Sequence, residues 1–241
     1  MKTTKDKKQQ TYASKGKTER VLLRTLMKNE KFLKNIQQHY EMVCYETPED
    51  SKKYNDAVLV RFVKDTKYFY DNIIVEAKVR TQDYEYGANP GKLLLEKKKL
   101  QNLKSEAYGW CNDPTREVHI IYISCIPDGT YIWHLSKTTK IKIDGNKKNI
   151  EWKDREIKWV EEEHNKSTME DLGKEMKWVG YLDKKTALKI DINCYDIFRI
   201  EEQEDKDAKE AELRKKQSLR DGRVYCLFEY LMQDENENNK K

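Results

Sequence analysis

The stretch Ile73-Ile74-Val75-Glu76-Ala77-Lys78-Val79-Arg80 decides the fold. Successive side chains of a β-strand point to opposite faces, so the apolar odd-numbered residues are predicted to enter a core while Glu76, Lys78 and Arg80 share the other face. An acid and a lysine two residues apart then reach one site. Asp71, five residues before Glu76, is predicted to point to the opposite face.

The apolar run at 56–63 predicts a partner strand, because Lys64-Asp65-Thr66-Lys67 separates it from a second β-prone run at 69–80. An antiparallel pairing centred on Thr66 places Asp56 opposite Glu76, and one centred on Lys67 places it opposite Lys78. Either register brings these three side chains together.

Further elements follow on both sides of this hairpin. Apolar residues recur at helical spacing from Lys17 to Tyr40, which predicts a first helix, and a second helix is predicted from Lys92 to Ala107. Pro127-Asp128-Gly129-Thr130 separates two apolar runs and predicts another hairpin over 118–135. The order helix, strand, strand, helix, strand, strand indicates an α/β core.

The second predicted helix carries a carboxylate on its apolar stripe. At about 100° per residue, Glu96 falls inside the stripe formed by Leu93, Leu100 and Leu103. A buried unpaired carboxylate costs several kcal/mol, so Glu96 is expected to meet a cation, a metal or a lysine. Glu19, near the edge of the first helix's stripe, could approach the same region, although a first-turn glutamate is also favoured by the helix dipole.

The remaining chain divides by composition. Residues 1–16 form a basic flexible tail, 17–136 the α/β core, and 137–200 a β-rich extension with a capping-box signal at Ser167 and Glu170. Residues 201–233 combine a charged helix with an apolar C-terminal segment, and 234–241 are expected to be a disordered tail.

The overall composition sets aside several protein classes. With 48 Lys+Arg against 43 Asp+Glu, the net charge of +5 permits a nucleic-acid partner without requiring one. No run of 18 apolar residues and no apolar leader occur, so secretion and membrane spanning are not expected. The five Cys are widely spaced without a CxxC pair, which favours a reducing, cytoplasmic compartment over a zinc site.

Asn55-Asp56, nineteen intervening residues, Glu76-Ala77-Lys78 and a following helix with Glu96 together resemble the PD-(D/E)xK nuclease superfamily. The resemblance covers about residues 17 to 135, and Asn55 replaces the proline of the family signature. Glu76, Lys78, Arg80, Glu96 and Lys99 look like the phage and mobile-element branch. The implied fold is α/β, a restriction-endonuclease-like core with a mixed sheet flanked by helices, followed by a C-terminal α+β extension.

The same resemblance implies a metal-dependent nuclease that hydrolyses phosphodiester bonds, with DNA as the expected substrate. Asp56 and Glu76 would hold Mg²⁺ or Mn²⁺ through hard oxygen ligands, and Lys78 would be the catalytic lysine that orients or deprotonates the attacking water. By resemblance, the backbone carbonyl of Ala77 is a further metal ligand, and Glu96 or Glu19 supports the site. The expected contacts to nucleic acid are Arg80, Lys98, Lys99, Lys15 and Lys17.

Other interpretations stay open at this level. A Glu-x-Lys tripeptide on a strand is also typical of a cross-strand ion pair, and lysines on a helix are typical of a solvated face. The alternative function is a catalytically inactive nuclease-like module that binds DNA or serves a phage or mobile-element assembly. A second copy of the chain or an assembly protein would then be the partner, in the cytoplasm of a bacterial host. DNA and RNA, and endo- and exonuclease action, are not distinguished.

Overall fold

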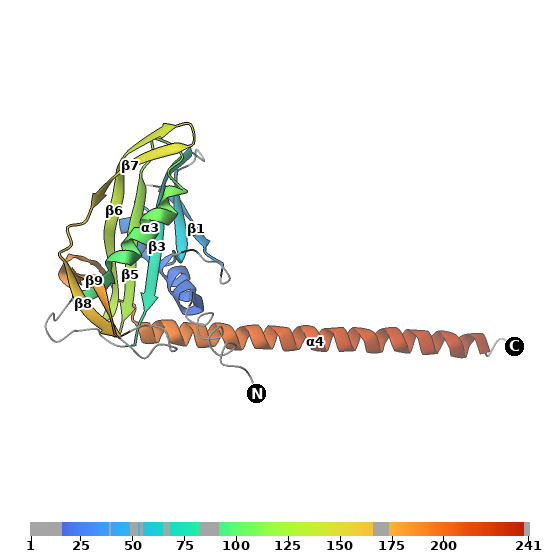
Figure 1. Ribbon diagram of the computed structural model, residues 1–241. Helices are drawn as coiled ribbons and strands as arrows, with labels where there is room; N and C mark the ends of the chain where they lie inside the picture. Colours follow the sequence, from blue (N-terminus) through green and yellow to red (C-terminus); the bar gives the residue numbers. More distant parts are fainter. Residues whose placement is uncertain are drawn as a thin grey trace. The chain divides into compact units, whose positions relative to one another are not determined.

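The computed structural model describes residues 16–38, 40–48, 53, 55–64, 68–81, 92–165 and 174–238, the last range with side chains up to 217. The main sheet has the strand order β1-β2-β3-β5-β6-β10, and β7 pairs with β6 (Figure 1). Among the strand pairs of the described residues in this sheet, β3–β5 alone is parallel, so the sheet is mixed and mostly antiparallel. Its strands are β1 (Tyr40–Glu46), β2 (Ala57–Val63), β3 (Tyr68–Val79), β5 (Val118–Ile126), β6 (Gly129–Asp144), β7 (Lys147–Asp154) and β10 (Leu188–Ile190).

A smaller antiparallel sheet has the order β4-β9-β8, and short helices join the elements. The indole nitrogen of the buried Trp133, on β6, donates a 3.0 Å hydrogen bond to the Asp183 carbonyl at the end of β9, which ties the two sheets together. The smaller sheet consists of β4 (Lys92–Glu96), β8 (Trp159–Asn165) and β9 (Lys174–Asp183). The helices are one over 16–26, α2 (Glu30–Ile36), α3 (Lys97–Tyr108), a 3₁₀ turn (Lys184–Thr186) and α4 (Cys194–Asn238).

The predicted hairpin at 56–80 is confirmed, with one of the two proposed registers. Ala57 pairs with Val75 and the Asp56 amide donates to the Val75 carbonyl at 2.9 Å, which continues the register centred on Thr66 and sets Asp56 opposite Glu76. A bulge between Arg61 and Phe62 shifts the pairing nearer the turn. Turn residues 65–67 are outside the described part of the chain.

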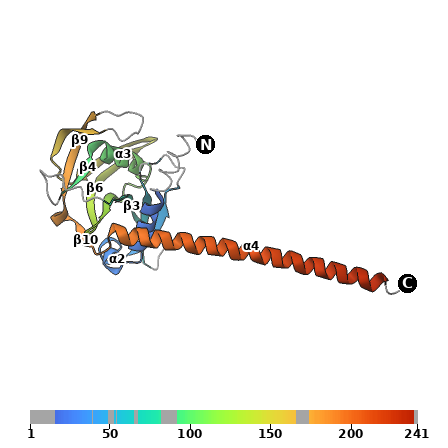
Figure 2. The ribbon, with the colours of Figure 1, turned by 90° about the horizontal axis from the view of Figure 1, so that it is seen from below.

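Helices cover both faces of the main sheet, as Figures 1 and 2 show with α3 on one side and α2 on the other. β3 is connected to its parallel neighbour β5 through β4 and α3, the kind of crossover that a parallel pair requires. Leu100 and Leu103 of α3 are buried in one core with Ile74, Ile120 and Trp133 of the sheet. Side chains that alternate along β3 therefore pack into the layers on both faces of the sheet.

The single first helix predicted from Lys17 to Tyr40 is wrong. The structure has a helix over 16–26, then α2, and Tyr40 already begins β1. The break occurs at Asn29, whose side-chain oxygen accepts a 3.0 Å hydrogen bond from the Phe32 amide and so caps α2. The strand β1 was missed because its partner, β2, lies beyond the Pro-containing segment.

The predicted second helix begins five residues later than expected. Residues Lys92–Glu96 form the strand β4, paired with β9 from Lys92↔Asp183 to Glu96↔Val179, and α3 begins at Lys97. Leu93 and Leu95 alternate in burial as a strand requires, whereas Leu100, Leu103 and Ala107 keep the helical spacing. The short apolar run fits both periods, and a partner strand more than eighty residues later decides between them.

The hairpin predicted at 118–135 is confirmed as β5 and β6, joined through Gly129 with φ of +139°. Beyond residue 137 the chain forms the end of β6 and the strands β7 to β10, while the capping-box residues Ser167 and Glu170 are outside the described residues. The helix α4 continues to Asn238, so residues 234–238 are helical where a disordered tail was expected. Among the described residues Cys44, Cys111, Cys125 and Cys194 are free thiols.

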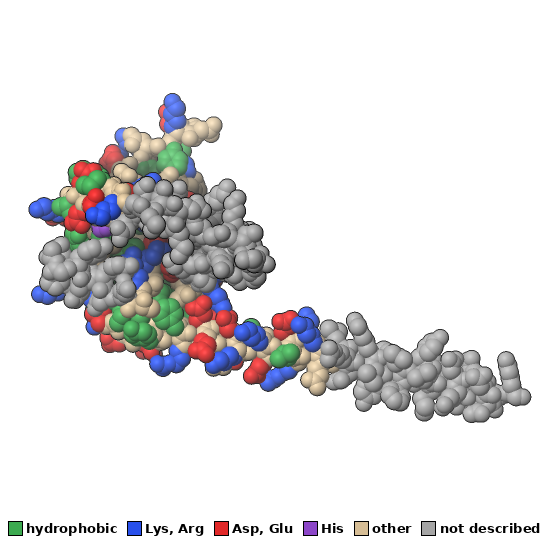
Figure 3. Space-filling view, turned by 60° about the horizontal axis from the view of Figure 1, so that its bottom comes forward, with side chains coloured by type: hydrophobic (Ala, Val, Ile, Leu, Met, Phe, Trp, Pro, Cys, Tyr) green, Lys and Arg blue, Asp and Glu red, His purple; other side chains and the backbone are tan. Residues whose placement is uncertain are grey.

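The described side chains of α4 from 201 to 217 are mostly charged, as predicted for this segment. Lys206 pairs with Glu202 and Lys216 with Glu212, both at i,i+4 spacing, and Figure 3 shows basic and acidic side chains interspersed along the helix. Such exposed pairs contribute little to stability, because water and salt screen the charges. None of the helices within the described ranges is long and apolar enough to cross a membrane.

Gly180 on β9 gives a test of the smaller sheet. A Cβ at this position would lie 2.2 Å from Cγ2 of Ile157 and 3.1 Å from the Trp159 ring. We expect Gly180→Ala to lower the unfolding free energy by about 1–3 kcal/mol, as overpacking does. Gly109→Ala is the control, because its nearest atom is at 3.4 Å and its φ is −61°. Urea denaturation of both variants would measure the loss of stability. Equal denaturation midpoints for Gly180→Ala and Gly109→Ala would contradict the close packing at Gly180.

Candidate active site

Asp56, Glu76 and Lys78 converge at the end of the β2–β3 hairpin. Lys78 Nζ lies 2.9 Å from Glu76 Oε1 and 3.9 Å from Asp56 Oδ2. The parity of β3 puts residues 76 and 78 on one face, and the hairpin register puts Asp56 beside them. The structure thus brings together the three residues that the sequence singled out.

Asp56 is held at the point where β2 begins. Its Oδ2 accepts a 2.7 Å hydrogen bond from the Ala77 amide, in place of the backbone partner that a longer β2 would supply. The amide and carbonyl of one strand residue point to the same edge of the strand, so the Ala77 carbonyl faces the same edge as Asp56. The Asp56 side chain is 22% exposed, which leaves the cluster accessible from solvent.

Glu19, on the helix over 16–26, is the supporting acid that the structure brings to this cluster. Its Oε1 lies 3.4 Å from Lys78 Nζ, and the residue is buried. Three carboxylates therefore surround one ammonium. Glu19 was one of the two residues proposed for this place.

Glu96, the other residue proposed for this place, does not reach the cluster. It precedes the first turn of α3, its side chain is 42% exposed, and its Oε1 pairs at 3.0 Å with Lys177 of β9. The prediction that Glu96 lies on the apolar stripe of the helix is wrong, because Glu96 ends the strand β4 and is not part of the helix. Its place beside Glu76 is taken by Lys99, whose Nζ lies 2.6 Å from Glu76 Oε1.

The basic residues expected to contact nucleic acid are distributed unevenly. Arg80 donates a 3.2 Å hydrogen bond to the Tyr122 hydroxyl, and its backbone amide donates to Cys125, so it extends the same sheet face as Lys78. Lys98 is exposed on α3 and Lys17 is half-buried in the first helix, while Lys15 lies outside the described residues. Lys99 belongs to the cluster itself, which spacing along the helix did not indicate.

Burial and charge together set the protonation of the cluster. Burial raises the pKa of Glu19 to about 7, against the opposing effect of Lys78. Burial also raises the pKa of Glu76, which is 1% exposed. For Lys78, burial alone would lower the pKa, but Glu76, Asp56 and Glu19 outweigh it and raise the pKa above its ordinary value. Lys78 is therefore an ammonium at neutral pH.

The donor set of the cluster suits a hard divalent cation, which prefers carboxylate and carbonyl oxygens. Asp56 and Glu76 come from adjacent strands, and the Ala77 carbonyl lies on the edge that faces Asp56. Within the described ranges, however, no three His, Cys, Asp or Glu side chains are arranged to hold an ion. Lys78 and Lys99 offset most of the carboxylate charge instead. An ion at Glu76 Oε1 would compete with the ammonium groups that contact this oxygen.

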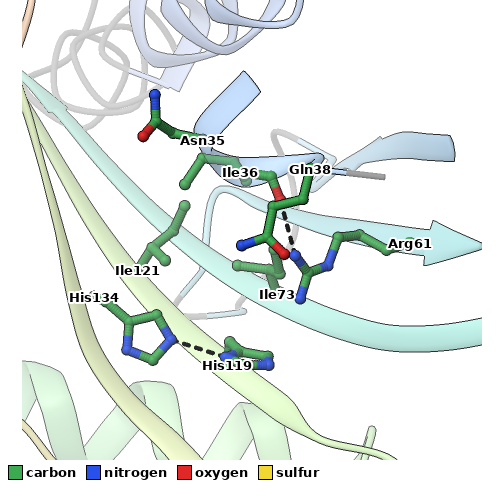
Figure 4. Close-up of a pocket in the computed structure, with 8 residues that line it drawn as sticks. All are labelled: Asn35, Ile36, Gln38, Arg61, Ile73, His119, Ile121 and His134. Atoms are coloured by element: carbon green, nitrogen blue, oxygen red, sulfur yellow. Dashed lines mark hydrogen bonds between the residues drawn. The ribbon is translucent and has the colours of Figure 1, made fainter. Parts of the chain in front are cut away.

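A second polar cluster lies on the opposite face of the sheet, at a pocket of about 210 Å³ (Figure 4). Asp71, predicted to point to that face, pairs with Arg61 and with His119, whose Nε2 is 3.1 Å away. His119 Nδ1 is hydrogen-bonded to His134 Nε2 at 2.8 Å. Burial alone would raise the pKa of Asp71, but the hydrogen bonds from Arg61 and His119 keep it below its ordinary value. The sequence did not indicate this network, because its members come from four strands.

Glu19 supplies a pH-dependent test of the first cluster. The folded protein retains the proton of Glu19 up to about pH 7, whereas the ordinary pKa is 4.5. Since the folded state then binds more protons, Glu19 should reduce the unfolding free energy as pH rises through this window, by up to about 3 kcal/mol. We expect Glu19→Gln to gain stability relative to the wild type between pH 4.5 and 8.

The measurement is urea denaturation at several pH values in EDTA, with Glu41→Gln, an exposed glutamate of β1, as the control. Parallel pH profiles for Glu19→Gln and the wild type would show that Glu19 is not a buried carboxyl of raised pKa.

Comparisons of the chain with protein-family models, with curated proteins and with solved structures found no match.

Proposed function

We propose that this chain is a metal-dependent nuclease that hydrolyses phosphodiester bonds in DNA, built on a restriction-endonuclease-like core. The observation that carries the proposal is the convergence of Asp56, Glu76 and Lys78 at one solvent-accessible position. The order of the first helix, β2, β3, α3 and β5, with β3 and β5 parallel, supports the proposed core. A cytoplasmic location belongs to the same proposal.

In the proposed mechanism, Asp56, Glu76 and the Ala77 carbonyl would hold Mg²⁺ or Mn²⁺. When bound, the metal ion would polarise the scissile phosphate and lower the pKa of a coordinated water. Lys78, held as an ammonium by the carboxylates around it, is suited to orient the attacking water and to stabilise charge on the phosphate in the transition state. It is less suited to remove a proton, because its pKa is raised.

Glu19 has a different part in this scheme. Its side chain is buried, its Oε1 lies 3.4 Å from Lys78 Nζ, and its pKa of about 7 lets it gain or lose a proton near neutral pH. Glu19 would therefore position Lys78 and accept a proton within the site. Arg80, whose guanidinium contacts Tyr122, would bind a phosphate beside the scissile one.

One observation favours the alternative of an inactive nuclease-like module. Lys78 is within 4 Å of all three carboxylates and Lys99 contacts Glu76, so two ammonium groups offset most of the carboxylate charge without a metal ion. Such a module would keep the fold and bind DNA or an assembly partner while binding no metal at Asp56 and Glu76. Metal binding and cleavage separate the two functions.

The decisive test is cleavage of linear, circular and branched DNA, and of RNA, with Mg²⁺, Mn²⁺ or EDTA. We expect Lys78→Met to lower the cleavage rate by a factor of about 10²–10³, because it removes charge stabilisation of the transition state. Asp56→Asn should abolish metal-dependent cleavage, because it removes an anionic ligand. The control is Glu151→Gln, an exposed carboxylate on β7.

Circular dichroism should show that the variants are folded, and Lys78→Gln replaces Lys78→Met if that variant is not. Cleavage that persists in EDTA, or that is unchanged in both site variants, would reject the proposed site. Absence of cleavage on every substrate, with no Mn²⁺ bound to the wild type, would favour the inactive module.

A further inference from the structure

Lys99 occupies an unexpected place in the cluster. It lies in the first turn of α3, and its Nζ is 2.6 Å from Glu76 Oε1, closer than the 2.9 Å between that oxygen and Lys78. Two ammonium groups thus contact the oxygen of a single carboxylate. The carboxylate is the one that the proposed mechanism needs as a metal ligand.

The charges of the cluster show what Lys99 changes. Glu19, Asp56 and Glu76 contribute three negative charges when ionised, and Lys78 and Lys99 contribute two positive charges, which leaves −1. Without Lys99 the cluster would carry −2. A divalent cation is attracted more strongly to the cluster without Lys99. It also needs Glu76 Oε1 as a ligand, the oxygen that Lys99 contacts.

Lys99 and Lys78 differ in how firmly they are held. Lys78 contacts Glu76 and lies within ion-pair distance of Glu19 and Asp56, whereas the ion pair of Lys99 in the cluster is to Glu76. The side chains of both lysines are partly exposed, 28% for Lys99 and 33% for Lys78, whereas Glu76 is 1% exposed and fixed in β3. Because Lys99 contacts one carboxylate of the cluster and Lys78 lies among three, Lys99 is the member that can leave Glu76 with the smaller loss of ion pairs within the cluster.

We propose that Lys99 competes with the divalent cation for Glu76, and that its ammonium moves to a backbone phosphate when nucleic acid binds. This inference rests on the proposed nuclease function. Nucleic acid would then relieve the competition, so that metal and nucleic acid bind cooperatively. Lys99 is a positioning residue in this scheme, and it keeps the metal affinity low until substrate is present.

Mn²⁺ binding to the full chain without nucleic acid tests the competition directly, for example by the electron paramagnetic resonance signal of free Mn²⁺. We expect Lys99→Met to bind Mn²⁺ about tenfold more tightly than the wild type, within the usual range of coupling between sites. Lys98→Met is the matched control, because Lys98 is the preceding residue of α3 and is exposed. It should leave the Mn²⁺ affinity unchanged.

A second titration includes a short DNA duplex with a non-hydrolysable phosphate linkage. The duplex should raise the Mn²⁺ affinity of the wild type and of Lys98→Met by about tenfold or more, and that of Lys99→Met by clearly less. Reciprocally, saturating Mn²⁺ should tighten DNA binding by the wild type by the same factor. Lys99→Gln, checked by circular dichroism, serves if Lys99→Met does not fold.

The outcomes separate this inference from the proposed function. Equal Mn²⁺ affinity of the wild type and Lys99→Met, with Mn²⁺ bound to both, overturns the competition and leaves the metal-dependent nuclease intact. Mn²⁺ bound to neither protein, with or without the duplex, overturns both. A loss of stability in Lys99→Met with unchanged Mn²⁺ affinity would show that the ion pair with Glu76 is purely structural.

Discussion

The buried carboxylate of Glu76 is the constraint on which the rest of the site depends. With 1% of the side chain exposed, an unpaired charge there would cost several kcal/mol. Lys78 from the same strand and Lys99 from α3 both contact this carboxylate. Lys99 thereby links α3 to β3, and Lys78 links β3 to the segments that carry Glu19 and Asp56. The helix over 16–26 joins the cluster through Glu19, and the start of β2 joins through Asp56. Four segments of the chain thus meet around one charge.

The central strand β3 supports a polar network on each of its faces. Glu76 and Lys78 lie on the face covered by α3, and Asp71 lies on the other face with Arg61 and His119. The buried apolar residues Ile73, Ile74 and Val75 lie between them, so core residues border both networks. The low dielectric of that surrounding strengthens both networks and makes an unpaired member of either costly. β3, a strand of 12 residues, therefore contributes to a polar network on each face of the sheet.

Local signals determined the hairpins well. The alternation in 73–80 and the turn at Thr66 or Lys67 predict β2, β3 and the position of Asp56 opposite Glu76 or Lys78, because register in a hairpin depends on a few neighbouring residues. The structure has the first of these two registers. The same reasoning held for β5 and β6 around Pro127. It failed for residues 92–96, where Leu93 and Leu95 fit a strand and a helix equally well. There the choice depended on β9, which follows much later in the chain.

The sequence by itself therefore determined the strand that carries the cluster, its hairpin partner, and the three residues Asp56, Glu76 and Lys78. Only the tertiary structure decided which further groups complete the cluster. Glu19 belongs to the cluster and Glu96 does not. The position of Glu19 depends on how the helix over 16–26 packs, and that of Glu96 depends on which strand pairs with β4. Lys99 meets Glu76 for the same reason: contact between distant segments follows from packing, which no local periodicity specifies.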